Sequence, residues 1–100
     1  MFFAVIAKDK PGLSELRAQT KARHKAHLDA AAPGLRVLQS GPLLSPDGGE
    51  CGSLLVLEAE TAQAVEAFLS RDPYVQAGLF ASSEIHPWLW RRGNPYLIPA

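Results

Sequence analysis

The chain carries three histidines, and the position of one of them, His24, suggests acid–base chemistry. From Leu13 to about residue 32 the sequence is rich in Ala, Leu, Lys, Arg and Gln and lacks Gly and Pro, which predicts one long helix. At about 100° per residue, one face of this helix carries Leu13, Leu16, Arg17, Thr20, His24, His27, Leu28 and Ala31. Because an imidazole exchanges its proton near neutral pH, a histidine turned toward the protein interior is a candidate general acid or base.

Other interpretations of the histidines stay open. His24 and His27 are also compatible with a structural role, as hydrogen-bonded residues in the core or at the helix rim. A metal site formed by His24, His27, Asp72 and His86 is a further alternative, because two ligands three residues apart can share a helix face. A serine-based triad is disfavoured, because the sequence contains no Gly-x-Ser-x-Gly elbow.

The composition is that of one small folded domain. One hundred residues with 47% hydrophobic content are enough for a single core. Ten Lys and Arg balance ten Asp and Glu without a run of five like charges, which argues against nucleic acid or an anionic membrane as a partner. The single cysteine, Cys51, excludes an internal disulfide and a cysteine-based metal cage. With no leader peptide and no apolar stretch of about 20 residues, we expect a cytoplasmic protein.

The remaining patterns predict four strands and a second helix. Short apolar runs bounded by turn-forming residues predict strands at residues 2–7, 36–41, 53–57 and 79–86. The second helix is expected to begin after a capping Thr61 and to end at Arg71-Asp72-Pro73. The resulting order, βαββαβ, is that of an α+β ferredoxin-like fold, with one antiparallel four-stranded sheet and both helices on one face.

The second face of this sheet also needs cover. The strands are rich in Val, Leu, Ile and Phe on both sides, whereas the chain has only two predicted helices. A second copy of the chain is the simplest cover, so we expect a homodimer or a higher oligomer. The tail at residues 89–100 is too aromatic for a free end, and we expect it to dock on a protein surface, with the partner subunit as the candidate.

A series of short motifs resembles the YCII-related (YciI-like) family and extends from the first residue to Trp88. The motifs are Asp9-Lys-Pro-Gly12, Arg17 seven residues before His24, His24-x-x-x-Leu28, Gly41-Pro-Leu43, Gly52-Ser-Leu54, Asp72-Pro-Tyr74 and Ala77-Gly-Leu-Phe80. The series ends at Ile85-His-Pro-Trp88, which is similar to the family's Ile-Arg-Pro-Trp. No single motif is diagnostic, but the ordered set is specific. Two positions depart from the family pattern, since Lys21 and His86 stand where the family often has Arg, and Lys lacks the planar fork that orients an anion.

The resemblance implies a dimeric α/β barrel, in which two ferredoxin-like sheets pack face to face. It implies one YCII-related domain over residues 1–100, with a core at 1–88, and an active site built on a His–Asp pair, here His24 and Asp72. His27 also precedes a leucine, but the spacings to Arg17 and Leu28 favour His24 as the family histidine. Around this pair we expect five residues to bind the substrate: Arg17, Gly41, Pro42, Ser53 and His27.

The chemistry that a His–Asp pair supports is proton transfer. The carboxylate fixes the tautomer of the imidazole and stabilises the imidazolium, so the other ring nitrogen can remove or donate a proton. We therefore expect an enzyme that performs elimination, isomerisation or dehydrohalogenation on a small organic molecule, with neither a metal nor a cofactor. The alternative is a non-catalytic small-molecule-binding or accessory protein with the same dimeric fold.

Overall fold

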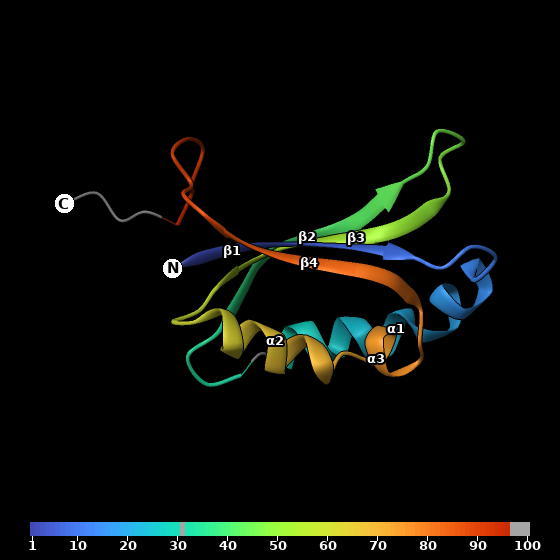
Figure 1. Cartoon of the computed structure of the whole chain (residues 1–100), viewed down its shortest axis with the longest axis horizontal. Coiled ribbons are helices and arrows are strands. Elements are labelled where there is room, and N and C mark those ends of the chain that lie inside the picture. The colour runs from blue at the N-terminus through green and yellow to red at the C-terminus, as the bar shows by residue number, and fades with distance from the viewer. Residues whose placement is uncertain (31, 97–100) are drawn as a thin grey trace.

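The computed structural model describes residues 1–30 and 32–96, which form one antiparallel sheet with its helices on one face (Figure 1). Along the chain the elements are β1 (Phe2–Asp9), α1 (Ser14–Ala30), β2 (Arg36–Leu44), β3 (Glu50–Glu58), α2 (Ala62–Ser70), α3 (Pro73–Gln76) and β4 (Phe80–Trp88). The strand order is β2-β3-β1-β4. This confirms the predicted ferredoxin-like fold, whereas the packing of two such sheets into a barrel stays a prediction.

Strand β1 lies in the interior of the sheet, where it pairs with β3 and β4. Its side chains alternate between two environments. Phe3, Val5 and Ala7 are buried on the side of the helices, as a strand with one covered face requires. They pack with Leu55, Leu57, Val65 and Phe68 into the hydrophobic core. At the end of β1, Ala7 pairs with Ser53 of β3 on one side and with Ser83 of β4 on the other, so the three residues form one row across the sheet.

The helices differ from the sequence-based prediction at one place. Helix α2 begins after Thr61, whose hydroxyl accepts a hydrogen bond from the Ala64 N–H, as expected of its N-cap. The segment Asp72-Pro73 was predicted to end this helix, but it also begins the short helix α3, with Asp72 as N-cap and Pro73 in its first turn. Proline fits there because the first N–H groups of a helix have no partner within the helix. None of the helices in the described ranges is long and apolar enough to cross a membrane.

The predicted strand boundaries were too short at β2 and β3. Both strands extend toward the turn at Ser45–Gly49, so that Gly41, Pro42 and Ser53 lie within paired strands and not at their ends. Irregular pairing at Val37/Gln39 and Leu43/Leu44 interrupts the alternation of β2, so its full length does not follow from a regular strand pattern.

Close packing at the start of β3 leads to a stability prediction. A Cβ atom added at Gly52 would overlap the carbonyl oxygen of Ala7 and come within 3.1 Å of Leu43 Cδ1, whereas nothing lies within 4 Å of the same atom at Gly41. Because backbone cannot move aside as a flexible side chain can, Gly52→Ala is expected to lower the free energy of unfolding by about 1–3 kcal/mol. Gly41→Ala is the matched control, and equal urea midpoints for the two variants would refute the expectation.

The aromatic tail docks on its own chain through residue 96. The Trp90 ring lies 5.6 Å from the Phe2 ring, edge to face, and the Tyr96 hydroxyl donates a hydrogen bond to the Leu38 carbonyl at 2.7 Å. Residues 89–96 therefore contact β1 and β2 of the same chain, and docking of the tail on the partner subunit stays a prediction. Residue 31, expected on the inner helix face, and the tail end at 97–100 lie outside the described residues.

The homodimer stays a prediction. Ile6, Leu54 and Val56 lie on the sheet face away from the helices, and Leu54 is 39% exposed. Exposed Glu84 and His86 of β4 adjoin them in the same rows, so this face mixes apolar and polar side chains.

Candidate active site

Helix α1 turns the predicted side chains toward the sheet. Arg17 and Thr20 are buried, and Leu16, His24, His27 and Leu28 are half-buried. All other residues of α1 are exposed. The helical periodicity therefore identified the inner face correctly. It could not identify the partners of the polar residues on that face, because those come from β1, β3 and α3.

His24 and Asp72 are joined by a hydrogen bond. His24 Nδ1 lies 2.8 Å from each carboxylate oxygen of Asp72, and the two side chains are 12% and 1% exposed. The Tyr74 N–H donates to Asp72 Oδ1 at 2.9 Å, since Asp72 is the N-cap of α3. A carboxylate only accepts hydrogen bonds, so His24 Nδ1 is the donor in this contact, and in the neutral imidazole Nε2 then carries the lone pair.

Tyr74 forms the floor beneath the imidazole. Its ring stacks on His24, with centroids 4.0 Å apart and planes 18° apart, and the guanidinium carbon of Arg17 lies 4.7 Å from the same ring. Burial raises the pKa of Tyr74, and the charges of Glu50, Asp72 and Asp9 raise it further, while Arg17 opposes them. The phenol therefore stays protonated at neutral pH, and Tyr74 serves as a rigid wall that limits the tilt of the His24 ring.

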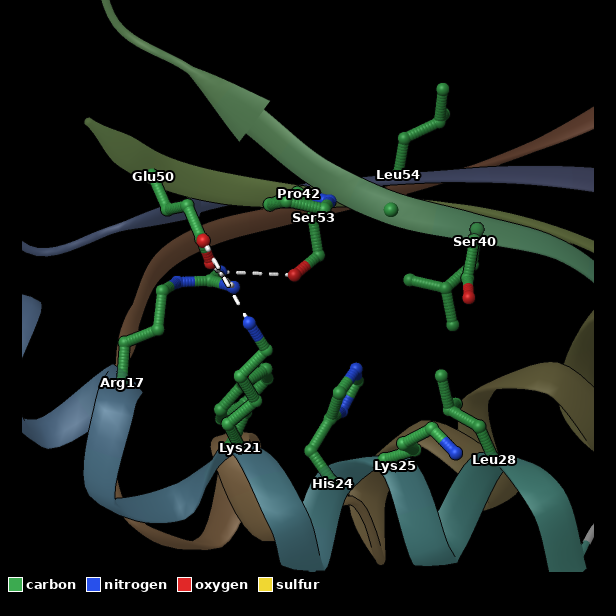
Figure 2. Close-up of a pocket in the computed structure, with 13 residues that line it drawn as sticks. Arg17, Lys21, His24, Lys25, Leu28, Ser40, Pro42, Glu50, Ser53 and Leu54 are labelled. Atoms are coloured by element: carbon green, nitrogen blue, oxygen red, sulfur yellow. Dashed lines mark hydrogen bonds and ion pairs between the residues drawn. The ribbon is translucent and has the colours of Figure 1, made fainter. Parts of the chain in front are cut away.

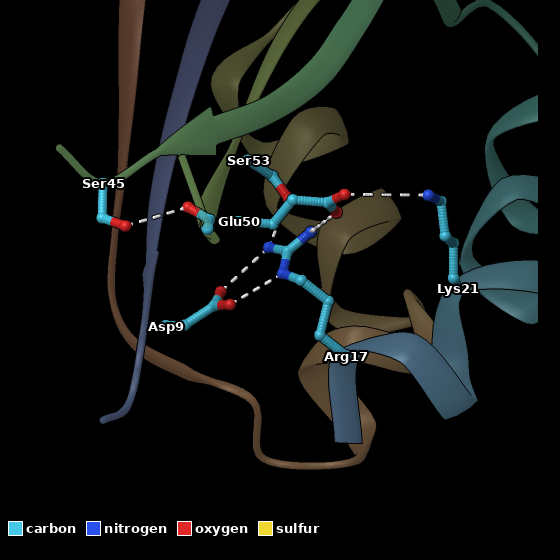
Figure 3. Close-up of polar contacts among 7 residues, drawn as sticks. Asp9, Arg17, Lys21, Ser45, Glu50 and Ser53 are labelled. Atoms are coloured by element: carbon cyan, nitrogen blue, oxygen red, sulfur yellow. Dashed lines mark hydrogen bonds and ion pairs between the residues drawn. The ribbon is translucent and has the colours of Figure 1, made fainter. Parts of the chain in front are cut away.

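Arg17 is held in a buried polar cluster at the other end of the same helix face (Figure 3). Its Nε and Nη2 donate to the two carboxylate oxygens of Asp9 at 2.7 and 2.9 Å, and Nη2 also donates to Ser53 Oγ at 2.9 Å. Burial acts to lower the pKa of Arg17, but the hydrogen bonds and charge of Asp9, with help from Tyr74 and Glu50, outweigh it and raise the pKa. Arg17 thus remains charged inside the protein.

A pocket of about 190 Å³ lies between α1 and the β2–β3 pair (Figure 2). Its lining includes four of the predicted substrate-binding residues, Arg17, Gly41, Pro42 and Ser53, together with His24. Lys21, Lys25 and Glu50 lie at its more exposed side, with Lys21 Nζ 3.9 Å from a Glu50 oxygen. Asp72 is not part of the lining, because it lies behind the imidazole that it holds.

The three histidines do not converge on one place. His27 Nε2 donates to the Phe68 carbonyl at 2.9 Å, and its ring stacks on Phe68, so the residue ties α1 to the end of α2 and lies outside the pocket lining. Substrate binding by His27 stays a prediction, for which this pocket gives no support. His86 lies on the other face of the sheet, with Nε2 3.1 Å from Glu84. Of the four residues considered for a metal site, His24 and Asp72 meet, and no group of three candidate ligands occurs among the described residues.

Sequence reasoning did not assign roles to several residues around the site. Asp9 and Tyr74 were quoted only as parts of motifs, and Glu50 and Lys25 were given no role. The available signal was the buried position of Arg17, because a buried guanidinium requires a carboxylate. The sequence placed Arg17 on the inner face of the helix but could not show which carboxylate it meets.

Thr20 leads to a prediction about stability within this helix face. Thr20 follows Arg17 and precedes His24 on the inner face of α1, and its side chain is fully buried. Its hydroxyl has no hydrogen-bond partner among the residues that the structure describes. Valine has the same shape and helix propensity but no polar atom to desolvate. Thr20→Val is therefore expected to keep the free energy of unfolding within about 0.5 kcal/mol or to raise it. A clearly lower melting temperature of Thr20→Val than of the native protein would mean that this hydroxyl has a partner.

The sequence matches the model of the YCII-related domain over residues 1–89. The chain belongs to the YCII-related family. Protein YciI of Escherichia coli O6:H1 and a protein of Haemophilus influenzae are each 30% identical to it over 94 residues, covering 88% of this chain and 96% of theirs. The predicted resemblance to this family is thereby confirmed over residues 1–89.

Solved structures with this fold include enzymes. A 5-chloro-2-hydroxyhydroquinone dehydrochlorinase, TftG from Burkholderia phenoliruptrix AC1100, is 34% identical in sequence, with a TM-score of 0.76 over 89% of this chain and 94% of its own, in a complex with 2,5-dihydroxybenzoquinone. SnoaB, a cofactor-independent oxygenase from Streptomyces nogalater, covers 94% of this chain and 95% of its own, with a TM-score of 0.57 at 19% identity. The second likeness concerns the fold alone. This YCII-related chain therefore shares its fold with a dehydrochlorinase and an oxygenase.

Proposed function

We propose that this YCII-related protein is an enzyme in which His24, oriented by Asp72, transfers protons to and from a small hydroxylated ring compound. The observation that supports the proposal most directly is the 2.8 Å hydrogen bond between His24 Nδ1 and Asp72, at the wall of a pocket. Since Nδ1–H is engaged, Nε2 is the nitrogen that a ligand in the pocket can reach.

The size and lining of the pocket suit a single ring. An apolar cavity of about 150 Å³ holds benzene, so a pocket of about 190 Å³ accommodates one ring with substituents. TftG, which is 34% identical, was solved with 2,5-dihydroxybenzoquinone, a ring of this size. The exposed cations Lys21 and Lys25 favour a ligand whose hydroxyl groups are ionised.

Dehydrochlorination is the reaction that we assign first to this site. In the keto tautomer of the substrate the chlorinated carbon also carries a hydrogen. Nε2 of His24 removes the proton of the ring hydroxyl that is conjugated to this carbon, a C=O bond forms, the adjacent C=C bond shifts to the chlorinated carbon, and chloride leaves with the electrons of the C–Cl bond. The imidazolium is stabilised by Asp72 until it releases the proton to solvent. One proton and one chloride leave, so the step needs no oxidant or reductant.

Chloride release from 5-chloro-2-hydroxyhydroquinone tests this proposal. We expect the purified protein to release one chloride per substrate consumed, faster than the reaction without enzyme, and to bind 2,5-dihydroxybenzoquinone in a calorimetric titration. Binding without turnover would favour the non-catalytic small-molecule-binding alternative. If the protein neither binds the quinone nor releases chloride, hydroxylated rings of this type are not its substrates.

A further inference from the structure

We propose that the Ser53 hydroxyl donates a hydrogen bond to the ligand oxygen that becomes negatively charged when His24 removes a proton. This inference rests on the proposed function and assigns a catalytic role to a second residue of the same pocket. It concerns transition-state stabilisation, which a His–Asp pair alone does not supply.

Ser53 is placed opposite His24 by the sheet. In β3 the side chains of Ser53, Leu55 and Leu57 point toward the helices, and all three are buried. Figure 2 shows Ser53 extending from the sheet and His24 extending from α1 toward the same space. A ring bound between them would have His24 on one side and the Ser53 hydroxyl on the other.

The hydrogen bonding of Ser53 leaves its proton available. Arg17 Nη2 donates to Ser53 Oγ at 2.9 Å, and this is the only hydrogen bond of the Ser53 side chain within residues 1–30 and 32–96. A hydroxyl group accepts with its lone pairs and donates one proton, so the donor of Ser53 has no acceptor in this part of the chain. The residue is 3% exposed and lines the pocket, which makes a ligand oxygen the natural acceptor.

The Asp9–Arg17 pair fixes and strengthens this donor. Two hydrogen bonds to Asp9 hold the guanidinium, so the Ser53 oxygen is held in one direction before any ligand arrives (Figure 3). The positive charge of Arg17 draws electron density from Ser53 Oγ and makes its O–H a better donor. Arg17 is thus a positioning residue in this account.

The proposed contact changes strength during the reaction. Removal of the hydroxyl proton leaves negative charge on the ring oxygens, where the Ser53 O–H donates until the C=O bond forms and chloride leaves, while the removed proton stays on His24 Nε2. Ser53 keeps its own proton and forms no covalent bond. Because the contact is stronger to an anion than to a neutral carbonyl, its loss lowers kcat more than it raises KM.

Ser53→Ala tests the inference against a matched control, Ser83→Ala. Ser83 pairs with Ala7 in the same row of the sheet, but it is exposed in β4 and lies outside the pocket lining. With 5-chloro-2-hydroxyhydroquinone, Ser53→Ala is expected to lower kcat about 10²- to 10³-fold, with KM changed much less. Its affinity for 2,5-dihydroxybenzoquinone is expected to fall about 10-fold. Ser83→Ala is expected to match the native protein in both measurements.

The outcomes separate this inference from the proposed function. If the native protein releases chloride and Ser53→Ala does so at the same rate, the Ser53 role is wrong and the proposed function stands. If the native protein neither binds the quinone nor turns over, both are wrong. Should Ser53→Ala fail to fold, Ser53→Thr and Ser53→Val give the same comparison, because they have one shape and differ in the hydroxyl. Equal activity of these two variants would also overturn the inference.

Discussion

His24→Asn is expected to lower kcat for chloride release by about 10²- to 10⁴-fold, the usual contribution of a positioned general base. The asparagine amide nitrogen takes the approximate place of Nδ1 and keeps a donor for Asp72, whereas the position of Nε2 is lost. Because Asp72 keeps its hydrogen bond from the Tyr74 N–H and its role as N-cap, the variant is expected to fold. Steady-state kinetics and circular dichroism measure the two effects separately.

His86→Asn is the matched control for this variant. It makes the same substitution on the other face of the sheet, where the His86 side chain has one polar contact in the described structure, with the exposed Glu84. We expect its kcat and KM to equal those of the native protein. A His24→Asn variant that retains turnover, or an equal loss in both variants, would remove His24 from the mechanism.

Asp9→Ala is expected to lower the free energy of unfolding by about 3–5 kcal/mol. The Asp9 and Arg17 side chains are 7% and 5% exposed, and two hydrogen bonds join them. The substitution leaves a buried guanidinium whose remaining partners are the Ser53 hydroxyl and, 4.0 Å away, Glu50. Desolvation of a charge without its counterion is one of the most destabilising changes available to a small domain.

The exposed pair Arg36–Glu58 provides the comparison for Asp9→Ala. It has a similar number of hydrogen bonds, but its side chains are 61% and 39% exposed, so water screens the charges. Glu58→Ala is therefore expected to cost about 0–1 kcal/mol in urea denaturation. If Asp9→Ala and Glu58→Ala shift the midpoint equally, the Asp9–Arg17 pair is not the structural anchor that we describe.

The order of elements and the inner face of α1 could be predicted because they depend on local patterns. The apolar runs, the Gly and Pro breaks and the position of His24 on the helix follow from periodicity within one segment. The 48-residue separation between His24 and Asp72 carries no such signal, and that pairing came from the family resemblance. Periodicity also could not distinguish His24 from His27, since they share one helix face and differ only in whether α3 or α2 lies opposite.

The polar cluster around Arg17 could not be predicted for a related reason. Asp9 and Arg17 are eight residues apart, across a loop with Gly12 at φ 77°, and their contact depends on how this loop returns α1 over the sheet. The same geometry places Ser53 against Arg17 through the pairing of β1 with β3. These contacts depend on tertiary packing, for which the sequence pattern of a single element gives no measure.

The most direct test of the account is the tautomer of His24, measured by ¹⁵N NMR of the imidazole at a pH where the ring is neutral. We predict a proton on Nδ1 and none on Nε2 in the native protein, and a shift toward the Nε2–H tautomer in Asp72→Asn. Addition of 2,5-dihydroxybenzoquinone is expected to shift the Nε2 resonance. A native His24 that carries its proton on Nε2, or an Nε2 resonance that is unchanged by the quinone, would contradict the role of His24 as the base of this pocket.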